Sequence, residues 1–302
     1  MEVKRCGLWL SAALLVALAA RNGALAATRP IAAIRHVVIV SVDGLRPDLL
    51  LRGRNPHMQA LMRAGSFTFW ARTVAEGYTL PSHVSMLTGV VPSRHGVTWD
   101  SHIEDAYPRV PTLFELAKRA GYTTALAAGK SKFIVLTKPG TIDWIFRGDE
   151  ESEDDLDVAR QASAMIRQHR PGLLFVHFGH FDRLGHATGW GSNPQMRALE
   201  QTDAALGLVE RALTAAELDG STAIILTADH GGAALLHPPE DVRSQFIPWI
   251  VAGPSIRRNY DLSMIPDLAV DTMSTFATAC ALLGIDVDPS IDGKPVLQII
   301  KY

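Results

Sequence analysis

Four short segments of the chain contain side chains that bind metal ions or act as nucleophiles. In chain order they supply Asp43; Thr79 with Ser82; Asp182 with His186; and Asp229 and His230 with His237 just beyond. Each segment lies at or just after an apolar run. Apart from Ser82, these residues provide three carboxylates, three imidazoles and one hydroxyl, which is the ligand set of a two-metal site that cleaves phosphate esters.

The mixture of nitrogen and carboxylate ligands indicates which metal would bind. Zinc accepts both kinds of ligand, whereas calcium prefers oxygen alone. In two-metal hydrolases the ions lie about 3.5–4 Å apart and stabilise both the attacking and the leaving oxygens. The sequence therefore predicts two divalent ions, with zinc as the first choice.

Thr79 is the candidate nucleophile. It lies two residues before Pro81, a position that suits the first turn of a helix. A hydroxyl there meets the positive end of the helix dipole and several free N–H groups, and metal coordination would activate it. On local sequence alone, helix capping by Thr79 or Ser82 is an equal alternative, and the two roles are compatible.

The segment Asp229-His230-Gly231-Gly232 is the most informative of the four. Adjacent Asp and His residues at a strand end can bind one metal together, and paired glycines allow close backbone approach. Asp182 and His186, four residues apart, would mean little alone. His237 precedes two prolines, so packing and a return of the loop onto the site are equal alternatives.

Two further histidines and one cysteine need separate interpretations. We expect His177, within an apolar run, to be a packed core residue, while the role of His180 stays open. Cys280 lies in an apolar helical pattern and is expected to be a core residue, so the mature chain forms no internal disulfide. The acidic run 149–155 is expected to complement the dipole on the solvated first turn of a helix.

Predicted strands and helices alternate along the chain. The strands cover 37–42, 66–74, 122–128, 173–178, 222–227 and 246–251; the helices cover 56–64 (after Asn55 as N-cap), 81–88, 111–120, 154–169, 194–216 and 271–283. This alternation predicts an α/β fold, a three-layer α/β/α sandwich with a mostly parallel central sheet. Residues that follow parallel strands meet at one sheet edge, so Asp43, Asp182 and Asp229 are expected to converge.

The N-terminus has the pattern of a secretory signal peptide. Lys4 and Arg5 precede the apolar run 8–20, and Ala24-Leu25-Ala26 is a small-x-small cleavage site. We therefore expect cleavage after Ala26, a periplasmic or secreted protein, and a single catalytic domain over 27–302. An uncleaved anchor is the alternative, although the run is short for a spanning helix.

The overall charge argues against a nucleic-acid partner. The formal net charge is −2, and no basic tract is interleaved with aromatic residues. The predicted partner is a small-molecule phosphate ester.

With these residues identified, the chain resembles the alkaline phosphatase superfamily and, within it, the type I phosphodiesterase/nucleotide pyrophosphatase branch. The resemblance extends from about Arg35 to Pro295 and includes Pro92-Ser93-Arg94-His95-Gly96-Val97 and Asp292-Gly293-Lys294-Pro295. It implies an alkaline-phosphatase-like fold, with a largely parallel sheet between helical layers. It also implies that Thr79 attacks phosphorus and forms a phospho-threonine intermediate, which water then hydrolyses.

The resemblance divides the ligands between two metals. One would be held by Asp182, His186 and His237, and the other by Asp43, Thr79, Asp229 and His230.

Some positions depart from the branch. Where the branch often has an asparagine that contacts the phosphoryl group, this chain has Ser82, as in related sulfatases, and Ser82 is a candidate phosphoryl contact. His237 follows His230 closely, where nucleotide pyrophosphatases have a long insertion. Lys130 resembles a sulfatase lysine near the substrate anion and is therefore a candidate oxyanion contact, but from the residue type alone we expect a surface lysine.

Several alternatives remain at this point. No arginine stands out as a contact for the non-bridging oxygens of a monoester, which favours diesters, but a phosphomonoesterase is the alternative. A sulfatase-like enzyme would need cysteine or serine at position 79 and arginine at 83, where the chain has Thr79 and His83. An alternative of another class is a non-catalytic zinc-binding protein, which has no need of a nucleophile. We expect 99–108 and 132–149 to line the substrate pocket.

Overall fold

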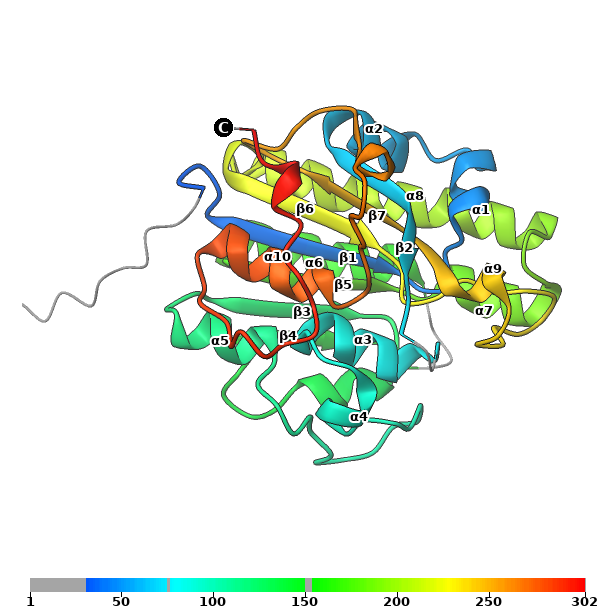
Figure 1. The fold of residues 1–302 in the computed structure, drawn as a ribbon, viewed down its shortest axis with the longest axis horizontal. Coiled ribbons are helices and arrows are strands. Elements are labelled where there is room, and N and C mark those ends of the chain that lie inside the picture. The colour runs from blue at the N-terminus through cyan, green and yellow to red at the C-terminus, as the bar shows by residue number, and fades with distance from the viewer. Residues whose placement is uncertain (1–30, 75–76, 150–153, 302) are drawn as a thin grey trace, which may run out of the picture.

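One mixed sheet forms the centre of the molecule (Figure 1). The structure is a computed structural model that describes residues 31–74, 77–149 and 154–301. The strands within these ranges are β1 (His36–Val42), β2 (Ser66–Arg72), β3 (Thr124–Ala128), β4 (Trp144–Arg147), β5 (Leu173–Phe178), β6 (Thr222–Thr227), β7 (Phe246–Ala252) and β8 (Tyr260–Asp261). Their order in the sheet is β4-β3-β5-β1-β6-β7-β2-β8.

The sheet is mostly parallel, as predicted. Strands β4, β3, β5, β1 and β6 run parallel to one another, and β7 runs antiparallel to both of its neighbours. Val37 pairs with Leu173 on one side and with Ala223 on the other. Strands β5 and β6 are buried along their whole length and β1 nearly so, which explains their almost unbroken apolar sequences.

Helices cover both faces of the sheet. They are α1 (Pro47–Arg52), α2 (Pro56–Ala64), α3 (Thr79–Thr88), α4 (Pro92–His95), α5 (Leu113–Arg119), α6 (Asp155–His169), α7 (His180–Thr188), α8 (Asn193–Ala215), α9 (Val242–Gln245) and α10 (Ser274–Leu283). Figure 1 shows α10, α3 and α5 in front of the sheet and α6 with α8 behind it. The predicted three-layer α/β/α architecture is therefore confirmed.

Helix termini differ from the predictions in a few places. Asn55 is the N-cap residue of α2, as predicted, but its side-chain amide donates to the Leu50 carbonyl and makes no capping hydrogen bond to the helix. The helix predicted from residue 111 begins at Leu113, because Thr112 caps it by accepting from the Glu115 N–H. Helix α7, at 180–188, was not among the predicted helices.

The acidic run is less exposed than predicted. Asp154 caps α6 by accepting from the Leu156 N–H, as its charge and position suggest. Asp155 is buried, so the expectation of a solvated first turn is wrong at this residue. Residues 150–153 lie outside the described residues.

Cys280 is buried on α10 and forms no disulfide, which agrees with the expected core role. The predicted signal peptide, 1–26, lies outside the described residues. Over 31–74, 77–149 and 154–301, no helix has both the length and the apolar character that crossing a bilayer requires.

Candidate metal centre

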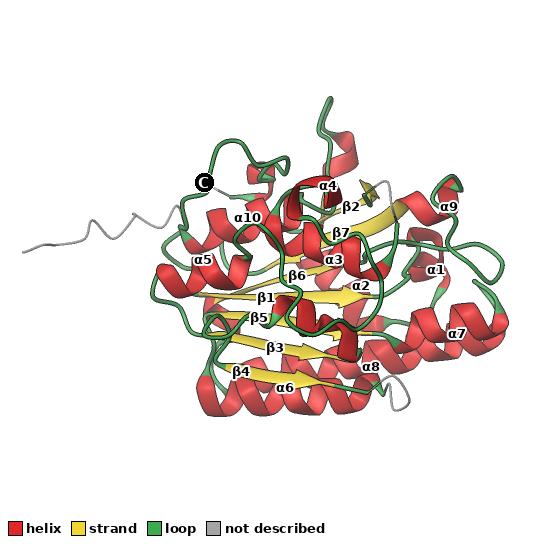
Figure 2. Ribbon diagram, turned by 90° about the horizontal axis from the view of Figure 1, so that it is seen from below, coloured by secondary structure: helices red, strands yellow, loops and turns green. Residues whose placement is uncertain are grey.

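The predicted metal-binding segments meet at the carboxyl edge of the sheet. In Figure 2 the parallel strands point toward the side where α7 lies. Asp43 directly follows β1, and its N–H donates to the Phe178 carbonyl at the end of β5. On the other side, the Gly44 N–H donates to Asp229 Oδ1 beyond the end of β6. The end of β1 is thus tied to the ends of both neighbouring strands.

The first group of ligand atoms belongs to Asp43, Asp229 and His230. One ligand atom from each lies within 4.8 Å of the others, and all three residues are fully buried. His230 Nε2 is 3.4 Å from Asp43 Oδ1 and 3.3 Å from Asp229 Oδ2. The adjacent Asp229 and His230 therefore direct both side chains to one place.

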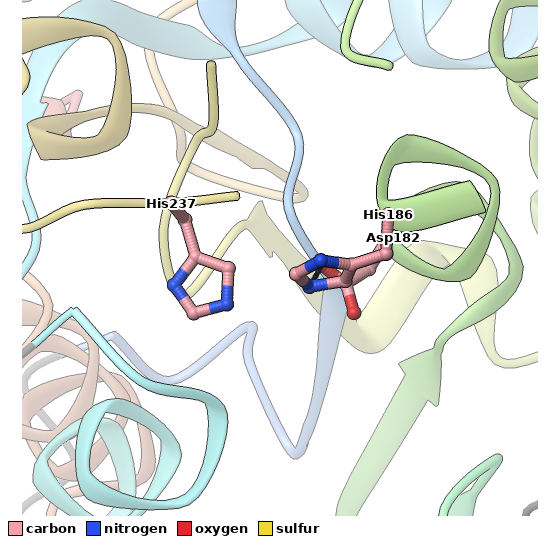
Figure 3. Close-up of side chains that lie close together, drawn as sticks. All are labelled: Asp182, His186 and His237. Carbon is pink, nitrogen blue, oxygen red and sulfur yellow. Dashed lines mark ion pairs between the residues drawn. The ribbon is translucent and has the colours of Figure 1, made fainter. Parts of the chain in front are cut away.

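The second group comprises Asp182, His186 and His237 (Figure 3). Asp182 and His186 lie one turn apart on α7, with Oδ1 and Nε2 3.5 Å apart. The loop after β6 returns, so that the His237 ring stacks on His230 with centroids 3.9 Å apart. His186 Nδ1 lies 2.8 Å from the Leu235 carbonyl, which leaves Nε2 directed at Asp182.

Polar atoms without partners mark the interior of the centre. Among the described residues, eight buried side-chain nitrogen or oxygen atoms have no hydrogen-bond partner. Five of them are Asp43 Oδ1, Asp182 Oδ1, Asp229 Oδ2, His230 Nε2 and His237 Nδ1. Each unpaired buried polar atom costs about 1–3 kcal/mol. Bound cations would satisfy these atoms, so the residues fit a pair of metal ions.

The pKa shifts reflect three carboxylates buried together. Burial, followed by the charges of Asp43 and Asp182, raises the pKa of Asp229 well above its usual value. Burial would also raise the pKa of Asp43, but the Lys130 ammonium and the contact with His177 outweigh it and hold that pKa well below its ordinary value. Burial lowers the pKa of His237 to about 4, so this imidazole is neutral at pH 7, as a metal ligand must be.

Lys130 lies inside the centre, so the expected surface position is wrong. Only 8% of the residue is exposed. Its Nζ is 2.8 Å from Asp43 Oδ2 and 2.9 Å from Asp182 Oδ2. The cause is topological: Lys130 follows β3, which pairs with β5 and therefore ends at the same edge.

Two further buried histidines contact ligand residues of the centre. His177 is fully buried, as expected of a core residue, but its Nε2 also lies 3.0 Å from Asp43 Oδ2. His83, one turn after Thr79, was not assigned a site role. Its Nε2 is 2.8 Å from Ser41 Oγ, and its Nδ1 is 2.8 Å from the Thr79 carbonyl and 3.5 Å from Asp229 Oδ2.

The first turn of α3 lies against both ligand groups. Thr79 is its first residue and is 2% exposed. On one side of Thr79 the Tyr78 ring contacts His237, with centroids 5.7 Å apart. On the other, Ser82 Oγ donates to the Asp229 carbonyl at 2.8 Å. Because this bond engages the hydroxyl hydrogen of buried Ser82, the geometry favours a positioning role for Ser82 over phosphoryl contact.

The two segments expected to line the pocket meet beside the candidate nucleophile. The Leu80 N–H, one peptide bond after Thr79, donates to Asp100 Oδ1 at 2.8 Å. Asp100 in turn pairs with Lys132, whose Nζ is 3.0 Å from both carboxylate oxygens. His180, in contrast, begins α7, and its Nδ1 bonds Arg183, so it belongs to neither ligand group.

Trp190 was missed by sequence reasoning, although it packs against three ligand segments. Its ring lies where side chains at Gly44, Gly185 and Gly232 would stand. A Cβ built at Gly232 would be 2.2 Å from the ring. The ring N–H donates to the Gly44 carbonyl at 2.9 Å. Glycines beside three ligand residues were the signal that a bulky side chain fills the space between them.

Known proteins share this arrangement of segments. The type I phosphodiesterase / nucleotide pyrophosphatase family matches residues 37–239, which include all four predicted segments. The chain belongs to this family.

Curated relatives include ectonucleotide pyrophosphatase/phosphodiesterase family member 1 of Homo sapiens. It is 24% identical over 216 residues, which are 64% of this chain and 23% of that protein. Bis(5'-adenosyl)-triphosphatase ENPP4 of Bos taurus is 24% identical over 231 residues, 65% of this chain and 47% of that one.

Solved structures share the fold at low sequence identity. Murine ectonucleotide pyrophosphatase/phosphodiesterase 5 superposes with a TM-score of 0.73 and 16% identity, covering 88% of this chain and 100% of that one. A phosphonate monoester hydrolase from Silicibacter pomeroyi has a TM-score of 0.65 and 15% identity, over 88% and 76% of the two chains. The predicted alkaline-phosphatase-like fold is confirmed. The chain spans about a quarter of the length of the first curated relatives it matches.

Proposed function

We propose that this protein is a two-metal, zinc-dependent hydrolase of phosphoric esters that acts on small phosphodiesters. The observation that carries the proposal is the pair of preformed ligand groups whose buried atoms have no partner and face one another. Beside them a threonine hydroxyl stands at the start of a ten-residue helix. A protein that only stored metal would have no use for that hydroxyl.

The ligands divide between the ions as the two groups do. Asp182, His186 and His237 would hold one ion; the other would be held by Asp43, Asp229 and His230 with Thr79. When bound, the ions would activate the attacking oxygen and stabilise charge on the leaving oxygen. The mixture of imidazole and carboxylate ligands supports zinc.

Thr79 acts as the nucleophile in this proposal. The Thr79 hydroxyl gives up its proton as Oγ attacks phosphorus, the ester oxygen leaves as an alkoxide that takes up a proton, and a phospho-threonine forms. Attack by water at phosphorus then releases phosphate monoester and restores the hydroxyl. The helix dipole of α3 supports the negative charge on the phosphoryl group throughout.

Diesters are the preferred substrate class, and two related activities remain as alternatives. The relatives are named as pyrophosphatases, phosphodiesterases and a bis(5'-adenosyl)-triphosphatase, all of which cleave an ester or anhydride of a substituted phosphate. Phosphomonoesters are an alternative, because the buried cation of Lys132 pairs with Asp100, which accepts from the Leu80 N–H in the first turn of α3. Sulfate esters are less favoured because Thr79 replaces the cysteine or serine that sulfatases modify.

A variant at Thr79 tests the nucleophile. Thr79→Ala should retain two zinc ions by elemental analysis, yet lose about 10³-fold or more in kcat on bis(p-nitrophenyl) phosphate, because the variant has no hydroxyl at the first residue of α3. Thr88→Ala is a matched control, since Thr88 has the same 2% exposure at the other end of the same helix.

The same assay also determines the preferred class of substrate. Comparing the diester with p-nitrophenyl phosphate and p-nitrophenyl sulfate ranks the three ester classes. Undiminished activity in Thr79→Ala would refute the phospho-threonine mechanism. Zinc binding without turnover on any ester would instead support the non-catalytic alternative.

We further propose that residues 27–302 form one catalytic domain that is exported after cleavage at Ala26. Several relatives are named ectonucleotide pyrophosphatases/phosphodiesterases, which agrees with export. N-terminal sequencing of the protein recovered from the periplasm or medium should begin at Ala27. Recovery of the intact leader in the membrane fraction would support anchoring instead.

A further inference from the structure

Lys130 touches both ligand groups at once. Its ammonium lies 2.8 Å from Asp43, which belongs to the first group, and 2.9 Å from Asp182, which belongs to the second. These two residues are far apart in the sequence and reach the centre from β1 and α7. Lys130 therefore forms a bridge between the two predicted ion positions.

The bridge uses one oxygen of each carboxylate and leaves the other for a ligand role. Lys130 bonds the Oδ2 atoms of Asp43 and Asp182, whereas the Oδ1 atom of each has no hydrogen-bond partner. The Oδ1 atoms lie toward the histidines, at 3.4 Å from His230 and 3.5 Å from His186. Holding the Oδ2 atoms thus fixes the direction in which both unpaired oxygens point.

The backbone around Lys130 gives the bridge a defined position. The Gly129 N–H donates to the His177 carbonyl at 3.2 Å, which continues the pairing of β3 with β5 past its end. A short 3-10 helix, Ser131–Leu136, follows and buries Phe133 in the core. The side chain is itself about nine-tenths buried, so water and salt screen its charge weakly.

We propose that Lys130 is a positioning residue that fixes the ligand geometry of both metal ions together. It contacts no ion; it acts through Asp43 and Asp182, as partners of ligating carboxylates do in other metal sites. The proposal rests on the two-metal centre of the proposed function but not on the reaction that it catalyses.

Metal affinity tests this role without measuring turnover. Lys130→Met removes both hydrogen bonds while keeping a side chain of similar length. Both zinc dissociation constants, measured by competition with a chromophoric chelator, should rise about 10–100-fold. Lys132→Met is the matched control, because Lys132 is equally buried at 8% exposed but pairs with Asp100. Its two zinc constants should stay at the wild-type values.

Each outcome bears on the proposal. An increase in both zinc dissociation constants in Lys130→Met supports the proposal, while an increase in only one of them refutes the bridge. Unchanged or tighter binding of both refutes it as well, since the lysine would then only balance charge. If circular dichroism shows that Lys130→Met is unfolded, Lys130→Gln, which keeps a donor but loses the charge and reach, is held to the same expectation.

The failure of this inference is distinguishable from that of the proposed function. A wild-type protein that binds no pair of ions would overturn the two-metal centre and, with it, this role of Lys130. A wild-type protein that binds two ions and hydrolyses diesters, with Lys130→Met binding them equally well, would overturn only the role of Lys130.

Discussion

Three glycines beside the ligand residues determine how closely the ligand segments approach. Gly44 follows Asp43, Gly185 precedes His186, and Gly232 lies two residues after His230. Trp190 fills the space that their missing side chains leave. Gly44 also adopts a φ of +72°, which L residues rarely accept. The close approach of the ligands thus depends on residues that carry no functional group.

Gly232→Ala should disturb this packing. The added methyl would lie 2.2 Å from the Trp190 ring, and overpacking of this kind costs about 1–3 kcal/mol. We expect a lower urea midpoint and weaker zinc binding. Gly220→Ala is the control, because a Cβ there meets nothing within 4 Å. Equal midpoints for the two variants would show that the ring moves freely.

The ligand residues were recognisable from sequence, but their supports were not. Asp43, Asp229 and His230 follow apolar strands directly, so their meeting could be predicted from the parallel sheet alone. Lys130 and Trp190 lie beside the same edge through the pairing of β3 with β5 and the return of the chain after α7. Those positions depend on long-range packing, which no local pattern indicates.

At the scale of elements, α7 carries two of the three residues of the second ligand group. A carboxylate on another helix holds its N-terminus: Asp155 of α6 accepts from the His180 N–H at 3.1 Å and from the Thr202 hydroxyl. Burial raises the pKa of Asp155 to about 6. Helix α7 was not predicted, because the carboxylate that holds its N-terminus lies far away in the sequence, whereas β5 and β6 were predicted at their observed bounds.

The raised pKa of Asp155 predicts a dependence of stability on pH. Because the pKa in the folded state, about 6, exceeds the ordinary aspartate value of 3.8, the stability that this group contributes is fully present below pH 3.8 and is lost as pH rises through 6. A shift of about two units corresponds to about 3 kcal/mol. The variant Asp155→Asn should not lose this stability as the pH rises.

The free energy of unfolding of wild type and of Asp155→Asn is measured by urea unfolding at pH 4.5 and 7.5, always in excess chelator. The comparison is between the changes in this free energy with pH in the two proteins. Asp157→Asn, on the exposed side of the same helix, controls for the removal of one carboxylate. Parallel pH profiles for wild type and Asp155→Asn would contradict the assigned pKa.

At the scale of the whole molecule, metal ions would join segments from both halves of the chain. The core of β1, β5 and β6 folds around apolar runs that need no ion, while the centre at its edge holds three buried carboxylates against one lysine. Ions that bind only the folded state stabilise it by mass action, by about 2.7 kcal/mol each at a hundredfold excess over the dissociation constant.

Removal of metal should therefore lower the melting temperature without abolishing the fold. For a chain of this size, the loss of two such ions corresponds to a decrease on the order of 10 °C. Calorimetry before and after dialysis against a chelator, followed by addition of zinc, measures it. A melting temperature that neither falls with chelator nor recovers with zinc would contradict a stabilising metal pair.

The order of the ligands along the chain sets when metal can be acquired. Asp43 leaves the ribosome early, but neither ligand group is complete until residues 230 and 237 have followed. A chain that is still growing or only partly translocated therefore contains no complete ligand group for an ion. Metal loading would have to wait for a nearly complete polypeptide, so the metal supply of the compartment in which the chain finally folds would govern how much metal-loaded protein a cell obtains.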